Sequence, residues 1–346
     1  MTSETSGANT SDPQQDLLTE NRSAYIPLGF YIDFLRFLDA HRDLIEIITY
    51  EDLEWGSERD PGACYAEEWK RWREALKDGR RDPRKVYVVL QHDVDSAPER
   101  TMNMLRWEDR YGIPSVSMIF NKRVNRRLLQ HRDRLEITDY ALDVQLLRDL
   151  QRRRFQIGYH CNAFERAHFD EARAIAVMRE DIEALSQKFD VRIMSAHGGA
   201  PGPGGRNNRD LPFPADLAER VRWVHNGHTP FFNATYSDGG INSQKRDPAK
   251  RDLRDFVRSW RPGGRYRILT HPQYYNAPCN ISPRLAKAEW YEEVKATYER
   301  AEPGNAWAEV SLAVAAPSLP ARTAQEGIAL LRHCRERMRT WLGQGR

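Results

Sequence analysis

The stretch VYVVLQHDVD at residues 86–95 joins a buried-strand signal to two carboxylates. Its first five residues are apolar and mostly β-branched, and charged residues precede them, which is typical of a core strand. Side chains alternate along a strand, so Asp93 and Asp95 are expected on one face while His92 and Val94 take the other. With Cα atoms roughly 6.5 Å apart, the two acids repel each other unless a cation or a shared proton lies between them. The stretch therefore predicts a core strand that ends in two carboxylates whose charges need a compensating group.

Strand and helix signals alternate along the chain after this stretch. Apolar runs predict strands at 113–120, 155–161, 192–197, 222–225 and 265–271. A capping box at 96–99 predicts a helix directly after the carboxylates, and further helices are expected at 140–153 and after Asp170. Such alternation predicts an α/β fold with a parallel sheet covered by helices, closed as a barrel or open and doubly wound. The number of strands favours the barrel.

The domain prediction has three parts. Residues 1–20 are polar and expected to be a disordered tail. Residues 21–85 are expected to form an extension that packs on the barrel, with two helices around a strand near residue 45. Residues 86–346 are expected to form the barrel and to end in an amphipathic helix from Thr323 to Leu342. Whether the extension caps the barrel, shapes its cleft or mediates oligomer formation is left open by the sequence.

Composition narrows the class of protein. The 53 basic and 50 acidic residues give a formal charge of +3 and are interspersed, which argues against a nucleic-acid-binding surface. The four cysteines form no CxxC pair, so neither a disulfide framework nor a cysteine zinc site is indicated. The N-terminus lacks the pattern of a secretion signal and no apolar run is long enough for a transmembrane segment. We therefore expect a cytoplasmic protein.

Histidines follow several of the predicted strands, namely His160, His197, His225, His228 and His271. Because the carboxyl ends of parallel strands form one face, these side chains are expected to converge with the aspartates. A single histidine at a strand end is more often a structural, hydrogen-bonded residue, but five such positions make an all-structural interpretation much weaker. Carboxylate and imidazole together suit zinc or another divalent transition metal. Sugar-binding and catalytic metal sites both remain open at this point.

The motifs HDVD at 92–95, QIGYH at 156–160 and ILTHP at 268–272 resemble those of the polysaccharide deacetylase family, also called the NodB-homology family. The resemblance covers about residues 86–275. It implies a distorted (β/α) barrel of the polysaccharide deacetylase type. It also implies removal of acetyl groups from N-acetylated or O-acetylated sugars with a divalent metal as cofactor.

The resemblance assigns roles to individual residues. It implies that Asp93 is the catalytic base, that Asp95 and His160 are metal ligands, and that His271 is the general acid. The family's second metal-binding histidine would fall at position 164, where this chain has phenylalanine. His197 and His168 are the candidates to replace it. His197 is preferred because it ends a predicted strand, whereas His168 is expected in a loop or at a helix start.

Two turn-rich segments are candidates for substrate binding. The segment HGGAPGPGGRNNRD at 197–210 is too rich in glycine and proline for a helix and is expected to form a rim in which Asn207 and Asn208 bind sugar hydroxyls. The segment at 233–240 adds Tyr236 and Asp238, the latter as a group that contacts substrate or orients a catalytic residue. Ordinary loop polarity explains both segments equally well.

The leading functional prediction is a metal-dependent carbohydrate deacetylase. In the absence of an export signal, a nucleotide-sugar, a lipid-linked saccharide or another glycan precursor is the expected substrate. A metal-independent glycoside hydrolase is a weaker alternative, because its two carboxylates normally come from different chain segments, whereas Asp93 and Asp95 leave one strand. A non-catalytic carbohydrate-binding pseudoenzyme that has lost its metal site at Phe164 is the third alternative.

Overall fold

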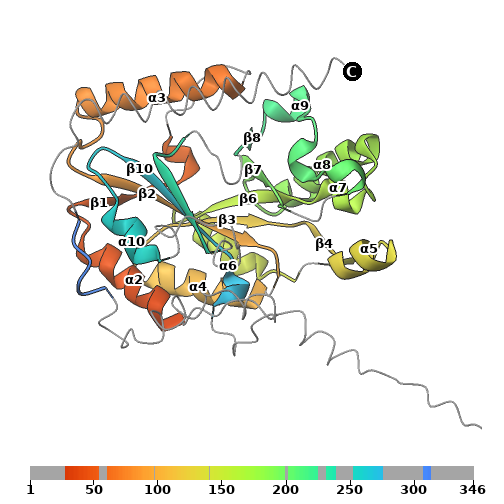
Figure 1. Ribbon diagram of the computed structural model, residues 1–346, viewed down its shortest axis with the longest axis horizontal. Coiled ribbons are helices and arrows are strands. Elements are labelled where there is room, and N and C mark those ends of the chain that lie inside the picture. Colours follow the sequence, from red (N-terminus) through yellow and green to blue (C-terminus); the bar gives the residue numbers. More distant parts are fainter. Residues whose placement is uncertain are drawn as a thin grey trace, which may run out of the picture.

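A curled parallel sheet dominates the mixed α/β fold (Figure 1). The computed structural model describes residues 28–53, 61–96, 98–139, 141–198, 202–224, 231–238, 252–275 and 307–312. The strands of the sheet are β1 (Ile45–Ile47), β2 (Val86–Val94), β3 (Val116–Ile119), β6 (Gln156–Cys161), β7 (Ile193–Ala196), β8 (Arg222–Trp223), β9 (Ala234–Ser237) and β10 (Arg265–Thr270). Their order is β8-β7-β6-β3-β2-β10-β9 with β1 beside β2, and all of these pairings are parallel. Within the described residues β8 and β9 do not pair with each other, so the sheet is a half-barrel.

Helices cover both faces of this sheet. The helices of the described residues are α2 (Leu28–Ala40), α3 (Pro61–Lys77), α4 (Pro98–Arg110), α5 (Arg126–Arg132), α6 (Val144–Gln151), α7 (Ala163–Arg166), α8 (Glu171–Ser186), α9 (Ala215–Ala218) and α10 (Leu253–Arg258), of which α5 lies beside β4, away from the main sheet (Figure 1). Short 3-10 turns lie at Tyr50–Asp52, Pro203–Gly205, Asn208–Asp210 and Pro272–Tyr274. An antiparallel hairpin of β4 (Lys122–Val124) and β5 (Ile137–Asp139) stands apart from the main sheet. In Figure 1, α3 lies on one side of the sheet, while α2 and α4 lie on the other.

The alternation along β2 divides the core into two layers. Val88 and Leu90 belong to the cluster that includes the buried aromatic residues of α2, on the outer face. Tyr87 and Val89 point the opposite way, into a second cluster with Trp72 of α3. Asp93 lies on the same side of the strand as Tyr87 and Val89 because the side-chain period is two. The concave face under α3 therefore carries the first aspartate of the HDVD motif.

Residues 28–53 are part of the sheet architecture. β1 pairs with Val86–Val88 of β2, and β3 pairs with the later stretch Gln91–Val94. Both β1 and β3 are parallel to β2, and they pair with successive stretches of it. β1 therefore extends the sheet alongside the first half of β2. The N-terminal segment thus contributes backbone pairing to the sheet as well as an external helix.

A buried ion pair ties α3 to the amino end of β10. Both carboxylate oxygens of Glu68 accept hydrogen bonds from the guanidinium of Arg265, and both side chains are 0 % exposed. The same guanidinium lies 3.8 Å from the ring centroid of Trp69 and 4.5 Å from that of Trp72. Arginine suits this position because its planar cation can stack on aromatic rings while it binds a carboxylate with two donors. The pair anchors α3 over the concave face.

Gly158 allows close packing beneath the site. A Cβ atom at this position of β6 would lie 2.5 Å from Met118 Sδ and 2.8 Å from Ile193 Cγ1. These side chains come from the two strands that flank β6. Only glycine lets both of them fill the concave face at this point.

Most of the predicted elements are present. The strand from residue 86 continues to Val94, and α4 begins at Pro98, soon after the carboxylates as expected. Asp170 caps α8, since its side chain accepts a hydrogen bond from the Arg173 backbone N–H. The interpretation of 233–240 as only a turn-rich segment is wrong, because Ala234–Ser237 forms β9 beside β10. Four residues between turn formers are too few to give a clear periodic signal.

Several predictions fall on residues that the structure does not describe. They are the tail at 1–20, the helix at Thr323–Leu342, and the two histidines His225 and His228. In the parts of the chain that are described, no helix is both long and apolar enough to cross a membrane.

Candidate metal centre

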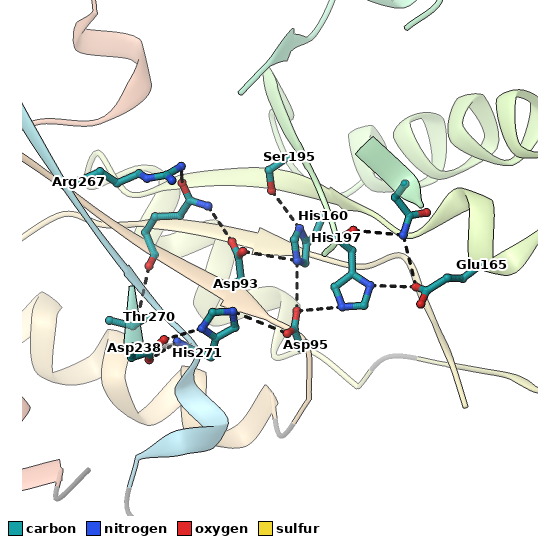
Figure 2. A network of polar contacts seen from close by, with 12 residues as sticks. Asp93, Asp95, His160, Glu165, Ser195, His197, Asp238, Arg267, Thr270 and His271 are labelled. Carbon is teal, nitrogen blue, oxygen red and sulfur yellow. Dashed lines mark hydrogen bonds and ion pairs between the residues drawn. The ribbon is translucent and has the colours of Figure 1, made fainter. Parts of the chain in front are cut away.

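The polar residues predicted from the sequence meet at the carboxyl ends of four strands (Figure 2). Asp93 is the penultimate residue of β2 and Asp95 follows this strand directly, while His160 is the penultimate residue of β6. His197 and His271 follow β7 and β10 directly. Parallel strands direct their carboxyl ends to one edge, so residues more than 170 positions apart in the sequence become neighbours.

Asp95, His160 and His197 form a compact cluster. One ligand atom from each residue lies within 4.8 Å of the other two. Asp95 Oδ1 is 3.2 Å from His160 Nε2 and 3.7 Å from His197 Nε2. Both histidines are almost completely buried, whereas Asp95 retains partial exposure. Two imidazole nitrogens therefore face one carboxylate oxygen at the edge of the sheet.

The donor set fits a divalent metal. Asp95 Oδ1 is buried and has no hydrogen-bond partner among the described residues, although two ring nitrogens face it. A buried carboxylate oxygen without a hydrogen bond is costly unless a cation compensates it. Two imidazoles and one carboxylate are a ligand set that zinc and other divalent transition metals accept, with room for a further ligand. The residues present are therefore compatible with a metal ion bound between them.

Charges in the cluster shift two pKa values in opposite directions. Burial would raise the pKa of Asp95, but the adjacent His197, His160 and His271 outweigh it and lower this pKa far below its usual range. Burial would also lower the pKa of His160, but Asp93 and Asp95 raise it above its usual value. The imidazoles around Asp95 thus hold its carboxylate in the ionised form.

Phe120 packs against both histidines of the cluster. Its ring is stacked on that of His160 at a centroid distance of 5.2 Å and an interplanar angle of 14°. The same ring meets His197 edge-on at 5.1 Å. One apolar side chain therefore limits the rotation of both imidazoles.

Asp93 lies beside the cluster. Its Oδ2 is 3.7 Å from His160 Nε2, while its Oδ1 accepts a hydrogen bond of 2.7 Å from the side-chain amide of Gln91. Gln91 Oε1 in turn accepts hydrogen bonds from Tyr50 OH and from the buried guanidinium of Arg267. These contacts run along the concave face and hold the carboxylate of Asp93 in one orientation.

His271 and Asp238 form a second pair on the other side of Asp95. Asp238 is 0 % exposed and accepts hydrogen bonds from the backbone N–H of His271 and from its ring Nδ1, at 2.6 and 2.5 Å. The remaining ring nitrogen, Nε2, is 3.9 Å from Asp95 Oδ2. Burial would lower the pKa of His271, but Asp238, with smaller contributions from Asp95 and Asp93, raises it to about 10. This imidazole therefore carries a proton at neutral pH.

The structure separates the two candidates for the third ligand. His168 is 39 % exposed and its Nε2 is 2.7 Å from Asp133 Oδ1, outside the cluster that His197 joins. Phe164 is buried in the core of α7 and α8 and packs edge-on against Phe169. The geometry therefore favours His197 at the metal centre.

Three of the proposed substrate-binding side chains lie too deep to contact a carbohydrate. Asn208 and Asp238 are 0 % exposed and Tyr236 is 1 % exposed. The side chain of Asn208 accepts a hydrogen bond from the backbone N–H of Phe164 and donates one to the carbonyl of His197. Tyr236 packs against Phe256 in the core on the outer face of the sheet. Because they are buried, the prediction that these three side chains contact the substrate is wrong. Asp238 retains its other predicted role, the orientation of a neighbouring residue, since it binds His271.

Asn207 is the remaining residue of that group. Its side chain accepts a hydrogen bond from the Arg209 backbone N–H and caps a 3-10 turn. The side-chain oxygen Oδ1 of Asn207 thus has a hydrogen-bond partner within the turn, while the rest of this side chain is partly exposed to solvent.

The sequence did not single out three residues that contact the site. Gln91 bonds to Asp93, Ser195 Oγ is 3.0 Å from His160 Nδ1, and Glu165 Oε2 is 2.9 Å from His197 Nδ1. Gln91 and Ser195 each precede a site residue by two positions on a strand, so the period of two could have placed them on the same face. Glu165 lies on α7 and has no comparable signal in the sequence.

Comparisons with known proteins give limited similarity. No protein-family model matches the chain, and no curated protein matches it. Among solved structures, a family 4 carbohydrate esterase from Bacillus anthracis is similar at 11 % identity, over 60 % of this chain and 75 % of that one, with a TM-score of 0.27. A mutant of a CE4 family pseudoenzyme with restored enzymatic activity is similar at 12 % identity, over 60 % and 62 % of the two chains, with the same TM-score. Similarity at TM-scores this low assigns no function to this chain.

Proposed function

We propose that this protein is a divalent-metal-dependent hydrolase that removes an N-linked or O-linked acetyl group from a carbohydrate or glycan precursor. The observation that carries the proposal is the cluster of Asp95, His160 and His197, whose ligand atoms lie within 4.8 Å of one another, flanked by Asp93 and His271. The half-barrel is compatible with the distorted barrel that the sequence resemblance implies. Zinc is the proposed metal, with Asp95, His160 and His197 as its ligands.

Hydrolysis of an amide or ester needs an activated water molecule, a stabilised oxyanion and a protonated leaving group. A divalent metal supplies Lewis acidity, which activates water and polarises the acyl carbonyl. Asp93 is the proposed base that takes a proton from the attacking water. The hydrogen bond from Gln91 orients its carboxylate for this task.

His271 is the proposed general acid. Asp238 holds its Nδ1 and keeps the ring charged, so Nε2 carries the proton that faces the cluster. Transfer of this proton to the departing nitrogen or oxygen lets the acyl carbon–heteroatom bond break. Acetate leaves, and the amine or hydroxyl stays on the sugar.

The experiment is an assay of acetate release from oligosaccharides that carry N-acetyl or O-acetyl groups. We expect acetate in equal amounts with new amine or hydroxyl groups, with a loss of at least about 100-fold after dialysis against a chelator and recovery on addition of zinc. Reducing-sugar release without acetate would instead support the glycoside hydrolase. Binding of the oligosaccharide without metal and without turnover would support the pseudoenzyme.

A further inference from the structure

We propose that Glu165 is a positioning residue that fixes the ring and the tautomer of His197 for metal binding. The proposal rests on the metal centre of the proposed function. Its starting observation is a hydrogen bond of 2.9 Å between His197 Nδ1 and Glu165 Oε2, in which both side chains are nearly buried (Figure 2). Glu165 comes from α7, so the contact joins this helix to the end of β7.

The chemistry of the two groups determines the tautomer. An ionised carboxylate can only accept hydrogen bonds, so His197 Nδ1 must carry the proton in this contact. In the neutral ring, the lone pair then lies on Nε2, the nitrogen that is 3.7 Å from Asp95 Oδ1. Glu165 therefore fixes the tautomer that presents the metal-binding nitrogen to the cluster.

Glu165 is itself held from two sides. Its Oε1 is 3.5 Å from the Arg126 guanidinium, which compensates the buried negative charge. The side-chain amide of Asn208 donates to Glu165 Oε2 at 3.5 Å and to the His197 carbonyl at 3.3 Å. The oxygen of the same amide accepts from the Phe164 backbone N–H at 2.9 Å. Asn208 thus links the start of α7 to the residue that Glu165 orients.

These contacts give a physical reason why His197 can serve as a ligand. Phe164 occupies the position where the resemblance would place a histidine, and its side chain is buried in the apolar core. Its neighbour Glu165 points to His197 instead. The short helix α7 thus supports the metal centre indirectly, through a carboxylate that orients the histidine directly after β7.

The test compares Glu165→Gln with the wild type in zinc affinity, measured by competition with a chromophoric chelator. The substitution preserves shape but removes the charge, and it replaces a group that can only accept hydrogen bonds by an amide that can also donate one to Nδ1. We expect the zinc dissociation constant to rise about 10- to 100-fold, because this is the usual effect of losing an orienting partner of a metal ligand. The cobalt-substituted protein should show an altered absorption spectrum, since the geometry of the His197 nitrogen changes.

Glu171→Gln is the matched control, because Glu171 is about half exposed and its partner Arg206 lies at the surface. The melting temperature of the metal-free protein reports on folding. If the glutamine variant does not fold, Glu165→Asp gives the same comparison, since its shorter side chain withdraws the acceptor from Nδ1. A folded variant with unchanged zinc affinity and an unchanged cobalt spectrum would overturn the proposal. Failure of the wild type to bind zinc would instead refute the metal centre of the proposed function.

Discussion

Replacement of Asp93 by asparagine is expected to lower the rate of acetate release by about 100- to 10,000-fold, the usual contribution of a general base. Asparagine has nearly the same shape and can still accept the hydrogen bond from Gln91, but it cannot take a proton from water. The measurement is the steady-state rate at saturating acetylated oligosaccharide. Zinc content should stay at the wild-type level, because Asp93 is outside the trio of proposed ligands.

Asp139→Asn serves as the control for this experiment. Asp139 lies on the exposed hairpin strand β5 and its side chain is almost fully exposed, so its replacement should leave the rate unchanged. Acetate release by Asp93→Asn at the wild-type rate would exclude Asp93 as the base.

Replacement of Glu68 by alanine is expected to lower the free energy of unfolding by about 3 to 5 kcal/mol, the usual cost of breaking a buried ion pair. Arg265 would remain 0 % exposed with its positive charge uncompensated by a carboxylate from α3. The aromatic rings of Trp69 and Trp72 retain their contact with the guanidinium but cannot replace two charge-assisted hydrogen bonds. Urea denaturation followed by circular dichroism measures the change.

The preceding residue on the same helix offers a matched control. Glu67 is partly exposed and pairs with Arg71 one turn later, so Glu67→Ala should cost less than about 1 kcal/mol. Equal costs for the two variants would mean that the buried pair does not anchor α3 to the sheet.

The sequence was sufficient to locate the edge of the sheet at which the candidate site lies. In VYVVLQHDVD the period of two separates Asp93 from His92, and the structure places Asp93 on the concave face beside His160, whereas His92 is on the outer face, bonded to Glu108 and Thr270. Strand ends converge because parallel topology requires it, so His160, His197 and His271 could be grouped without coordinates. Strong local patterns were enough for these residues.

Other features depend on tertiary contacts that leave no local pattern. Asn208 and Tyr236 are polar residues in turn-rich or short segments, and nothing in their neighbourhood indicates that tertiary packing buries them completely. Glu165 reaches His197 only because α7 follows β6 with the right orientation. Glu68 meets Arg265 across 197 positions of the chain. Composition and periodicity indicate which residues of a single helix or strand are buried. They do not indicate which helices and strands contact each other.

The metal content of the purified protein decides whether Asp95, His160 and His197 form a metal centre. The wild type should contain about one divalent metal ion per chain after incubation with zinc and removal of the excess, as should His168→Ala. His197→Ala should lose the metal while its circular dichroism spectrum stays that of a folded protein. A wild type without metal would exclude the metal centre, and a His197→Ala variant with full metal content would exclude His197 as a ligand.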